Sequence, residues 1–286
     1  MICTAPTQRS SSSTNGRDLW IPAFAFFVAI SVAVSPGARA GHDPAKIEPL
    51  ATEPAQPRAS AVRDGVRSTA AGLRLKLTAD LASVRIITLQ PGEAPAVRYS
   101  VHIETDAVGR AADQLLAQYS LSAKPFPGGV QITGTLPPQA ARARGAAQFW
   151  VRFEIAVPRS YSVEVTTGAG DIDTPDLDGT VVLVTQGGNI RCGRVGGARG
   201  VPAPALAARL ETREGGHILV QDVVGDLDAF TGGGHIAAGR ITGDAKLHSG
   251  GGNIRAGEIG GRADLSTDGG NITVGRAGGI VAVRTL

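Results

Sequence analysis

A short glycine-rich motif returns at a fixed spacing through the C-terminal third of this 286-residue chain. Gly-Gly-(Asn/His)-Ile ends at Ile190, Ile218, Ile236, Ile254 and Ile272, and a looser Ala-Gly-Asp-Ile copy ends at Ile172. The steps between these isoleucines are 18, 28, 18, 18 and 18 residues, so one insertion interrupts the period. Such a period is typical of solenoids, whose units bury their apolar side only against their neighbours. The sequence therefore predicts an all-β fold with a parallel β-helix-like β-solenoid of 18-residue coils over 166–286.

Each coil can be aligned column by column. Leu247, Ile254, Ala256, Ile259 and Leu265 are expected to point inward, with glycine pairs at the corners, where tight turns or close backbone approach favour glycine. The Ala256 column also contains the single cysteine of the repeats, Cys192, which we interpret as a small buried hydrophobe rather than a reactive thiol. A phosphate-binding loop is disfavoured, because no Lys-Ser/Thr follows the glycines. The Pro-containing insertion near 198–207 is expected outside the ladder.

Residues 68–165 form a β-rich section in which apolar and polar side chains alternate, as in half-buried strands. The alternation is clearest over 97–104 and 149–157. One helix is expected at 109–118 from the spacing of its apolar residues. Most of the 39 glycines lie beyond this section and most aromatic residues within it, which places a boundary near residue 166. The section is either a small β-sandwich or a set of irregular first coils, and the sequence leaves both open.

Residues 1–40 have the pattern of a signal peptide. Arg9 and Arg17 precede an apolar run over 19–35, and Ala38-Arg39-Ala40 is a small-residue cleavage site. A retained anchor is the alternative, although the run is short for a membrane span of about 20 residues. Residues 41–67 are rich in Pro and Ala and are predicted to be a flexible linker. We therefore expect an exported protein in the periplasm, cell envelope or cell surface.

The charge of the chain does not suggest a polyanionic partner. The formal net charge is +3, and it falls to +1 without residues 1–40, which hold three Arg and one Asp. No basic cluster remains that would bind nucleic acid, so no nucleic-acid partner is expected. Only one cysteine lies outside residues 1–40, which excludes a disulfide within the rest of the chain.

One aligned column alternates in sign at every coil. It contains Asp176, Arg194, Asp222, Arg240, Glu258 and Arg276. A second column, Asp228, Lys246 and Asp264, alternates in the same way. Because adjacent strands are about 4.8 Å apart, stacked opposite charges attract and like charges repel. We interpret the first column as a structural charge ladder that fixes register, since alternation cancels the field that an ionic polymer would need.

A polar column lies just before each inward isoleucine. Its members are Asp171, Asn189, His217, His235, Asn253 and Asn271. His217 and His235, on adjacent coils, could share a metal ion, but two imidazoles without a third ligand make an incomplete site. The column is therefore a candidate surface ladder of the kind that stacked amides form. No cofactor and no metal are expected. A calcium site at Asp171, Asp173, Asp176 and Asp178 is also disfavoured, because the spacing is not that of an EF-hand loop and the calcium-binding nonapeptide Gly-Gly-x-Gly-x-Asp is absent from later coils.

The segment Tyr161-Ser-Val-Glu-Val-Thr-Thr-Gly-Ala-Gly-Asp-Ile172 follows Val157-Pro158, and Thr-x-x-Gly-x-Ile repeats follow it with Gly225-Asp226-Leu227 between them. These motifs resemble the bacterial putative-adhesin family of β-strand-repeat proteins, an exported domain of unknown function, over roughly residues 70–286. The resemblance implies a β-solenoid without established catalytic residues. Fold alone does not establish function.

Three functions are compatible with these features. We expect a non-enzymatic exported cell-envelope protein, a scaffold for adhesion or assembly, because the repeats lack convergent reactive groups. The first alternative is a polysaccharide-active β-helix enzyme, which would need a pair of carboxylates in a groove. The second is an envelope-stress or signalling component. Because the last coil ends without a polar cap, we also expect self-association or a capping partner at the C-terminal end.

Overall fold

The computed structural model describes residues 58–145, 147–197 and 206–285. These residues form two ten-stranded sheets, so the expectation of an all-β fold is confirmed. In spatial order, sheet A contains β1 (Ala59–Ser68), β4 (Ala96–Thr105), β7 (Phe149–Val157), β3 (Ser83–Thr88), β9 (Ile172–Thr174), β11 (Ile190–Cys192), β13 (Ile218–Val220), β15 (Ile236–Ile241), β17 (Ile254–Ile259) and β19 (Ile272–Ala277).

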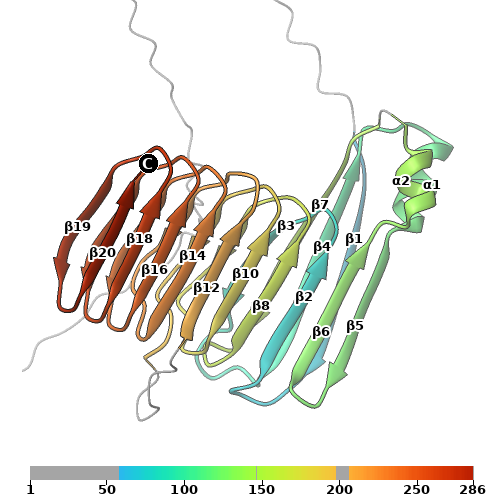
Figure 1. Ribbon diagram of the computed structural model, residues 1–286. Helices are drawn as coiled ribbons and strands as arrows, with labels where there is room; N and C mark the ends of the chain where they lie inside the picture. Colours follow the sequence, from blue (N-terminus) through green and yellow to red (C-terminus); the bar gives the residue numbers. More distant parts are fainter. Residues whose placement is uncertain (1–57, 146, 198–205, 286) are drawn as a thin grey trace, which may run out of the picture. The chain divides into compact units, whose positions relative to one another are not determined.

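Sheet B lies opposite sheet A (Figure 1). Its strands, in spatial order, are β5 (Ser120–Phe126), β6 (Gly129–Thr135), β2 (Arg74–Ala79), β8 (Ser162–Thr167), β10 (Val181–Thr185), β12 (Leu206–Thr212), β14 (Asp226–Thr231), β16 (Ala245–Ser249), β18 (Ala263–Thr267) and β20 (Val281–Thr285). The chain alternates between the sheets from β8 to β20. We call one sheet-B strand with the following turn and sheet-A strand a coil.

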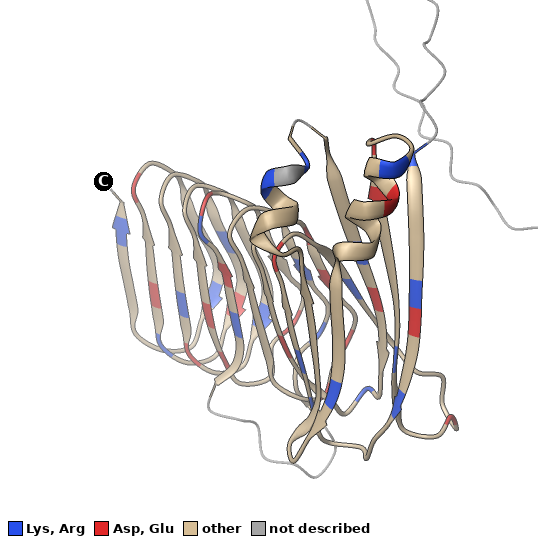
Figure 2. Ribbon diagram, turned by 90° about the vertical axis from the view of Figure 1, so that its right-hand side faces the viewer, with Lys and Arg blue, Asp and Glu red and all other residues tan. Residues whose placement is uncertain are grey.

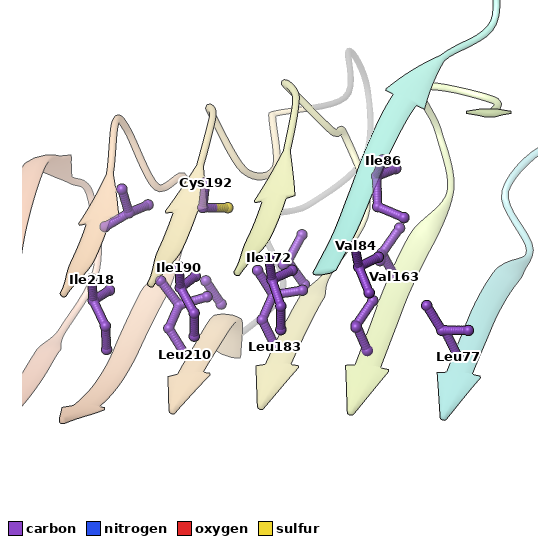
Figure 3. Close-up of a cluster of buried hydrophobic side chains, with 14 of the residues drawn as sticks. Leu77, Val84, Ile86, Val163, Ile172, Leu183, Ile190, Cys192, Leu210 and Ile218 are labelled. Atoms are coloured by element: carbon purple, nitrogen blue, oxygen red, sulfur yellow. The ribbon is translucent and has the colours of Figure 1, made fainter. Parts of the chain in front are cut away.

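Strands of successive coils pair in parallel, and the isoleucines that end each motif are direct partners. Ile172 pairs with Ile190, Ile190 with Ile218, and the series continues through Ile236 and Ile254 to Ile272. The first five of these isoleucines are buried. Their side chains meet sheet-B residues such as Leu183 and Leu210 between the sheets (Figure 3). The expected stacking of positions one period apart is therefore confirmed.

The inward residues predicted from the Leu247–Leu265 unit are also buried, at 0–2% exposure. The long step between Ile190 and Ile218 does not disturb the stack, because the two residues are still partners. Most of the insertion predicted near 198–207 lies outside the described residues. The turn from Thr212 to Ile218 is one residue longer than the equivalent turn from Thr231 to Ile236. The pairing of β12 with β14 is regular from Ala208 to Thr212, after a register shift between Leu206 and Ala208.

The section 68–165 continues both sheets and is not a separate sandwich. β2 pairs in parallel with β8, and β3 pairs in parallel with β7 and β9. One buried cluster runs from Leu75 to Leu265 without a break. The composition change near residue 166 falls inside β8, so it does not mark a boundary between packed units. The composition changes because the first layers bury aromatic side chains such as Tyr119, Phe153 and Tyr161, whereas glycine corners begin with the regular coils.

Antiparallel strands and two helices occur at the N-terminal side of the stack. β1 and β4 extend sheet A and β5 extends sheet B, each by antiparallel pairing. The expected helix is confirmed as α1 (Arg110–Gln118), which buries Ala112, Leu115 and Leu116. The short α2 (Pro138–Ala143) was not expected from the sequence. Neither described helix is long and apolar enough to cross a membrane.

The predicted linker 41–67 is wrong for its last part, because residues 59–67 belong to β1. This strand lacks large apolar inward residues and instead directs arginines across the open end between the sheets. Arg63 donates to the carbonyls of Tyr119, at 2.5 Å, and Leu116, at 2.8 Å, where α1 ends. Arg67 Nε donates to the Ala123 carbonyl of β5 at 3.1 Å. Cations stabilise helix C-termini, which explains a strand whose sequence looks like a linker. Residues 1–57, including the expected signal peptide, lie outside the described residues.

Close approach of adjacent coils explains the last glycine of each corner. A Cβ added at Gly252 would lie 2.1 Å from the Gly234 carbonyl oxygen, and one at Gly270 would lie 2.1 Å from that of Gly252. In contrast, a Cβ at Gly251 would meet nothing within 4 Å. At these corners packing therefore requires the glycine directly before the Asn or His, but not the glycine before that one.

We expect Gly252→Ala to lower the free energy of unfolding by about 1–3 kcal/mol, because the backbone of the neighbouring coil must move. Gly251→Ala is the matched control and should change it by less than about 1 kcal/mol. Urea unfolding of the two variants measures the difference. Equal stabilities would contradict the packing explanation.

Candidate functional site: ladders between coils and a hollow on sheet A

The polar column predicted from the sequence lies at the turn that precedes each sheet-A strand. Its side chains do not mainly bond one another. Instead, each accepts the backbone N–H of the column residue one coil further on: Asn189 Oδ1 from His217 at 2.9 Å, His217 Nδ1 from His235 at 2.9 Å, His235 Nδ1 from Asn253 at 2.8 Å, and Asn253 Oδ1 from Asn271 at 2.8 Å. Asp171 begins the series by accepting the Asn189 N–H at 2.8 Å. Asp, Asn and His share this column because each places an acceptor at the same distance from the backbone.

The histidines are used as acceptors in this ladder. The rings of His217 and His235 stack with centroids 5.0 Å apart and an interplanar angle of 8°. Because each Nδ1 accepts a backbone N–H, the neutral ring carries its proton on Nε2. Parallel rings also direct their Nε2 atoms side by side rather than toward one point. Among the described residues, no group of three or more His, Cys, Asp or Glu could hold a metal ion.

The charge ladder follows the expected register but pairs its side chains only at the C-terminal coils. Arg240 and Glu258 are strand partners, as are Glu258 and Arg276. Their side chains form ion pairs at 3.2 Å and 4.0 Å. Such exposed pairs contribute about 0–1 kcal/mol each. Across the stack, charges of both signs are interspersed along the strands (Figure 2).

At the earlier coils the aspartates of this ladder bond the backbone. Asp176 Oδ1 accepts the Arg194 N–H, and Asp222 Oδ1 accepts the Arg240 N–H, each at 2.9 Å. Asp226 and Asp244, which the sequence reasoning did not single out, do the same for the coils that follow them. The column Asp228, Lys246 and Asp264 is in register but forms no ion pair within 4.0 Å in the described chain.

Three of the four aspartates considered for calcium already have bonding partners. Asp171 accepts from Asn189, and its second oxygen lies 3.8 Å from Arg191 Nη1. Arg159 lies against Asp176 at 3.7 Å and against Asp178 at 3.3 Å. Asp173 is exposed on β9. The carboxylates therefore serve coil-to-coil and ion-pair contacts rather than one cation site.

A buried column of hydroxyls was not recognised in the sequence. Thr231 Oγ1, Ser249 Oγ and Thr267 Oγ1 each donate to a glycine carbonyl of the preceding coil at 2.8 Å. The signal was present as Ser or Thr at the same coil position. These bonds satisfy polar groups inside the core, where an unpaired one would be costly.

Cys192 occupies the inward column predicted for it. It pairs with Thr174 on one side and Val220 on the other, and it is 3% exposed. Thr174 Oγ1 donates to Sγ at 3.2 Å. Burial raises the pKa of the Cys192 thiol to about 12. A thiol with so high a pKa is protonated at neutral pH and is a poor nucleophile.

The structure also reveals a hollow of about 330 Å³ on the outer face of sheet A. β3 begins at Ser83, opposite Arg152, so residues 149–151 of β7 run past its start. The turns before β3 and β9 form the floor at Ala82 and Gly170. Trp150 borders the hollow and is 39% exposed. In the sequence, Trp150 falls on the polar face of the alternating segment 149–157, and a large aromatic residue at such a position was the available signal.

Replacing one ladder acceptor tests the coil-to-coil bonds. We expect His235→Leu to lower the free energy of unfolding by about 0.5–1.5 kcal/mol, because the Asn253 N–H loses its acceptor. His235→Asn retains an acceptor and should remain within about 0.5 kcal/mol of the parent. Denaturant unfolding distinguishes the two. A destabilisation of the same size in both variants would contradict the ladder.

The thiol of Cys192 can be tested with Cys3→Ser as the background, which leaves it as the only cysteine. Because its pKa is raised to about 12, the native thiol should stay protonated at pH 8. We expect a disulfide reagent to label it roughly a hundredfold more slowly in the folded chain than in urea. Rapid labelling of the folded chain would show that Sγ is accessible.

Comparisons with known proteins are weak. No family model matches the chain, and no curated protein matches it. The chain is similar to a solved putative cell adhesion protein from Clostridium sporogenes at 6% identity and a TM-score of 0.29, covering 79% of this chain and 100% of that one. It is also similar to a putative adhesin from Bacteroides fragilis at 12% identity and a TM-score of 0.30, covering 80% and 97%. A putative adhesin from Parabacteroides merdae matches at 8% identity and a TM-score of 0.25, covering 79% and 96%. Likenesses at these scores carry no argument about function.

Proposed function

We propose that this protein is a non-enzymatic, exported β-solenoid scaffold for adhesion or assembly at the cell envelope. The observation that carries the proposal is the use of its polar side chains. Asp, Asn and His at the turns accept backbone N–H groups of the next coil. Residue types that often act in catalysis are therefore committed to holding coils together.

Export is supported by the signal-like pattern of residues 1–40, whose small-residue cleavage site ends at Ala40. The resemblance of the repeats to the putative-adhesin family agrees with a place in the cell envelope. The polysaccharide-active enzyme is less well supported, because a hydrolase needs two carboxylates aimed at one bond. On the first coils Asp171, Asp176 and Asp178 instead bond backbone N–H groups or arginines.

The C-terminal coil supports assembly. β19 pairs with β17 and β20 with β18, and among the described strands each is the last of its sheet. Ile280 is 75% exposed, Val281 44% and Val283 50%. Unpaired strand edges with apolar side chains accept further strands. At the other end, Pro125 on β5 lacks a donor, and the arginines of β1 span the gap between the sheets. We therefore propose that a second copy or a capping partner pairs with β19 and β20.

Fractionation of bacterial cells that produce the full chain, combined with cross-linking, tests both parts. We expect an exported chain whose mature N-terminus follows Ala40, cross-linked through its last coil. The variant Val281→Lys with Val283→Lys should lose the cross-link, whereas a matched pair of lysines at exposed positions of β1, Val62→Lys with Val66→Lys, should keep it. An unprocessed chain confined to the cytoplasm would contradict the proposal. So would turnover of a polysaccharide panel that Asp173→Ala abolishes.

A further inference from the structure

Trp150 and Phe230 are exposed aromatic side chains, at 39% and 38%, and each borders a hollow on an outer face. Phe230 stacks on His248 with centroids 5.3 Å apart, and the neighbouring column alternates Arg209, Asp228 and Lys246. One face of the Phe230 ring is therefore covered, and the charges beside it alternate in sign. The hollow beside Trp150 differs in charge, because one of its arginines takes part in no ion pair among the described residues.

The indole of Trp150 is held in place from the β1 side. Arg58 Cζ lies 4.3 Å from the ring centroid, and Arg58 Nη1 lies 3.6 Å from Glu104 Oε2. Glu104 is the strand partner of Trp150, so the three side chains form one group across adjacent strands. A cation over an indole face is attracted by the ring's quadrupole. The ring is thus oriented before any ligand binds, which lowers the entropic cost of ordering the side chain on binding.

Arg152 supplies an uncompensated positive charge at the same hollow. Its strand partners are His102 on β4 and Ser83 on β3, and neither has a carboxylate. In the described part of the chain, Arg58 is ion-paired with Glu104, whereas Arg152 takes part in no ion pair. His102 and Arg152 both line the hollow beside Trp150. An exposed guanidinium can donate two parallel hydrogen bonds to the oxygens of a planar carboxylate.

The hollow therefore suits a ligand with one flat C–H face and a carboxylate beside it. The negatively polarised face of an indole attracts positively polarised C–H groups. Such faces occur on pyranose rings, and a hexuronic acid adds the carboxylate that Arg152 requires. We propose that this hollow binds acidic polysaccharides built of hexuronic acids. A sugar ring stacks on Trp150, and its carboxylate binds Arg152. The inference rests on the proposed function, because it names what an adhesive scaffold would hold.

The test uses the full chain with Trp20→Phe, which leaves Trp150 as its only tryptophan. Oligogalacturonate is titrated while indole fluorescence is recorded, and neutral galactose oligomers of equal length serve as the ligand control. We expect a saturable change with the acidic oligomer alone. Arg152→Gln should weaken binding at least about tenfold, because one charge-assisted pair is lost. Trp150→Ala, followed by calorimetry, should weaken it by a similar factor.

Two variants serve as controls. Arg255 is an exposed arginine on the same face of sheet A, and its strand partners Ala237 and Thr273 are also neutral, so Arg255→Gln should bind like the parent. Phe230→Ala should also bind like the parent. If Arg152→Gln fails to fold, Arg152→Lys decides, because it keeps the charge but loses bidentate geometry and should bind more weakly.

Three results would overturn the inference: no saturable binding, equal binding of neutral oligomers, or unchanged binding by the folded Arg152 variant. Failure of the proposed function gives a different result. If the chain is exported and cross-linked but does not bind oligogalacturonate, only the proposed ligand is wrong. If the chain is retained in the cytoplasm, the proposed envelope role is wrong, whatever the chain binds.

Discussion

A side chain on one coil accepts a backbone N–H of the next coil, and the regular stack depends on this contact. It occurs along the Asn/His column and again at Asp176, Asp222 and Asp226. The contact requires the coils to approach so closely that Gly252 cannot carry a Cβ. Because side chains alternate with a period of two, a slip of one residue would turn the isoleucine series toward solvent. The acceptors and glycines at the turns therefore fix the register on which the buried core depends.

Much of the C-terminal stack could be predicted because its structural repeat is also a repeat in the amino-acid sequence. Once Ile190 and Ile218 are recognised as equivalent, the inward column, the polar column and the position of Cys192 follow. What each polar side chain bonds could not be predicted, since Asp176 can equally pair with an arginine side chain or with a backbone N–H. In the structure Asp176 does both: Oδ1 accepts the Arg194 N–H at 2.9 Å, and Oδ2 lies 3.7 Å from Nη2 of Arg159, an arginine outside the column.

The N-terminal layers were less predictable because they do not repeat. β1 looks like a linker, since its inward position at Arg63 is polar and finds its partners at the end of α1, far along the chain. The hollow beside Trp150 arises where β7 runs past the start of β3. No local sequence pattern indicates that β7 extends beyond the start of β3. Residues held between coils thus build the stack, whereas Trp150 and Arg152, at its irregular end, keep exposed surfaces that binding can use.

The side-chain bonds of the polar column all run in one direction along the chain. In each, the N–H of the later coil donates to the earlier one, as from Asn253 to His235 and from Asn271 to Asn253. When a coil docks on a completed preceding coil, the acceptors for its N–H groups are therefore already in place. In the reverse order, the N–H donors of the later coil would be in place before their acceptors. Stacking that begins at the end braced by α1 and β1 would therefore add each new coil to a row of exposed acceptors.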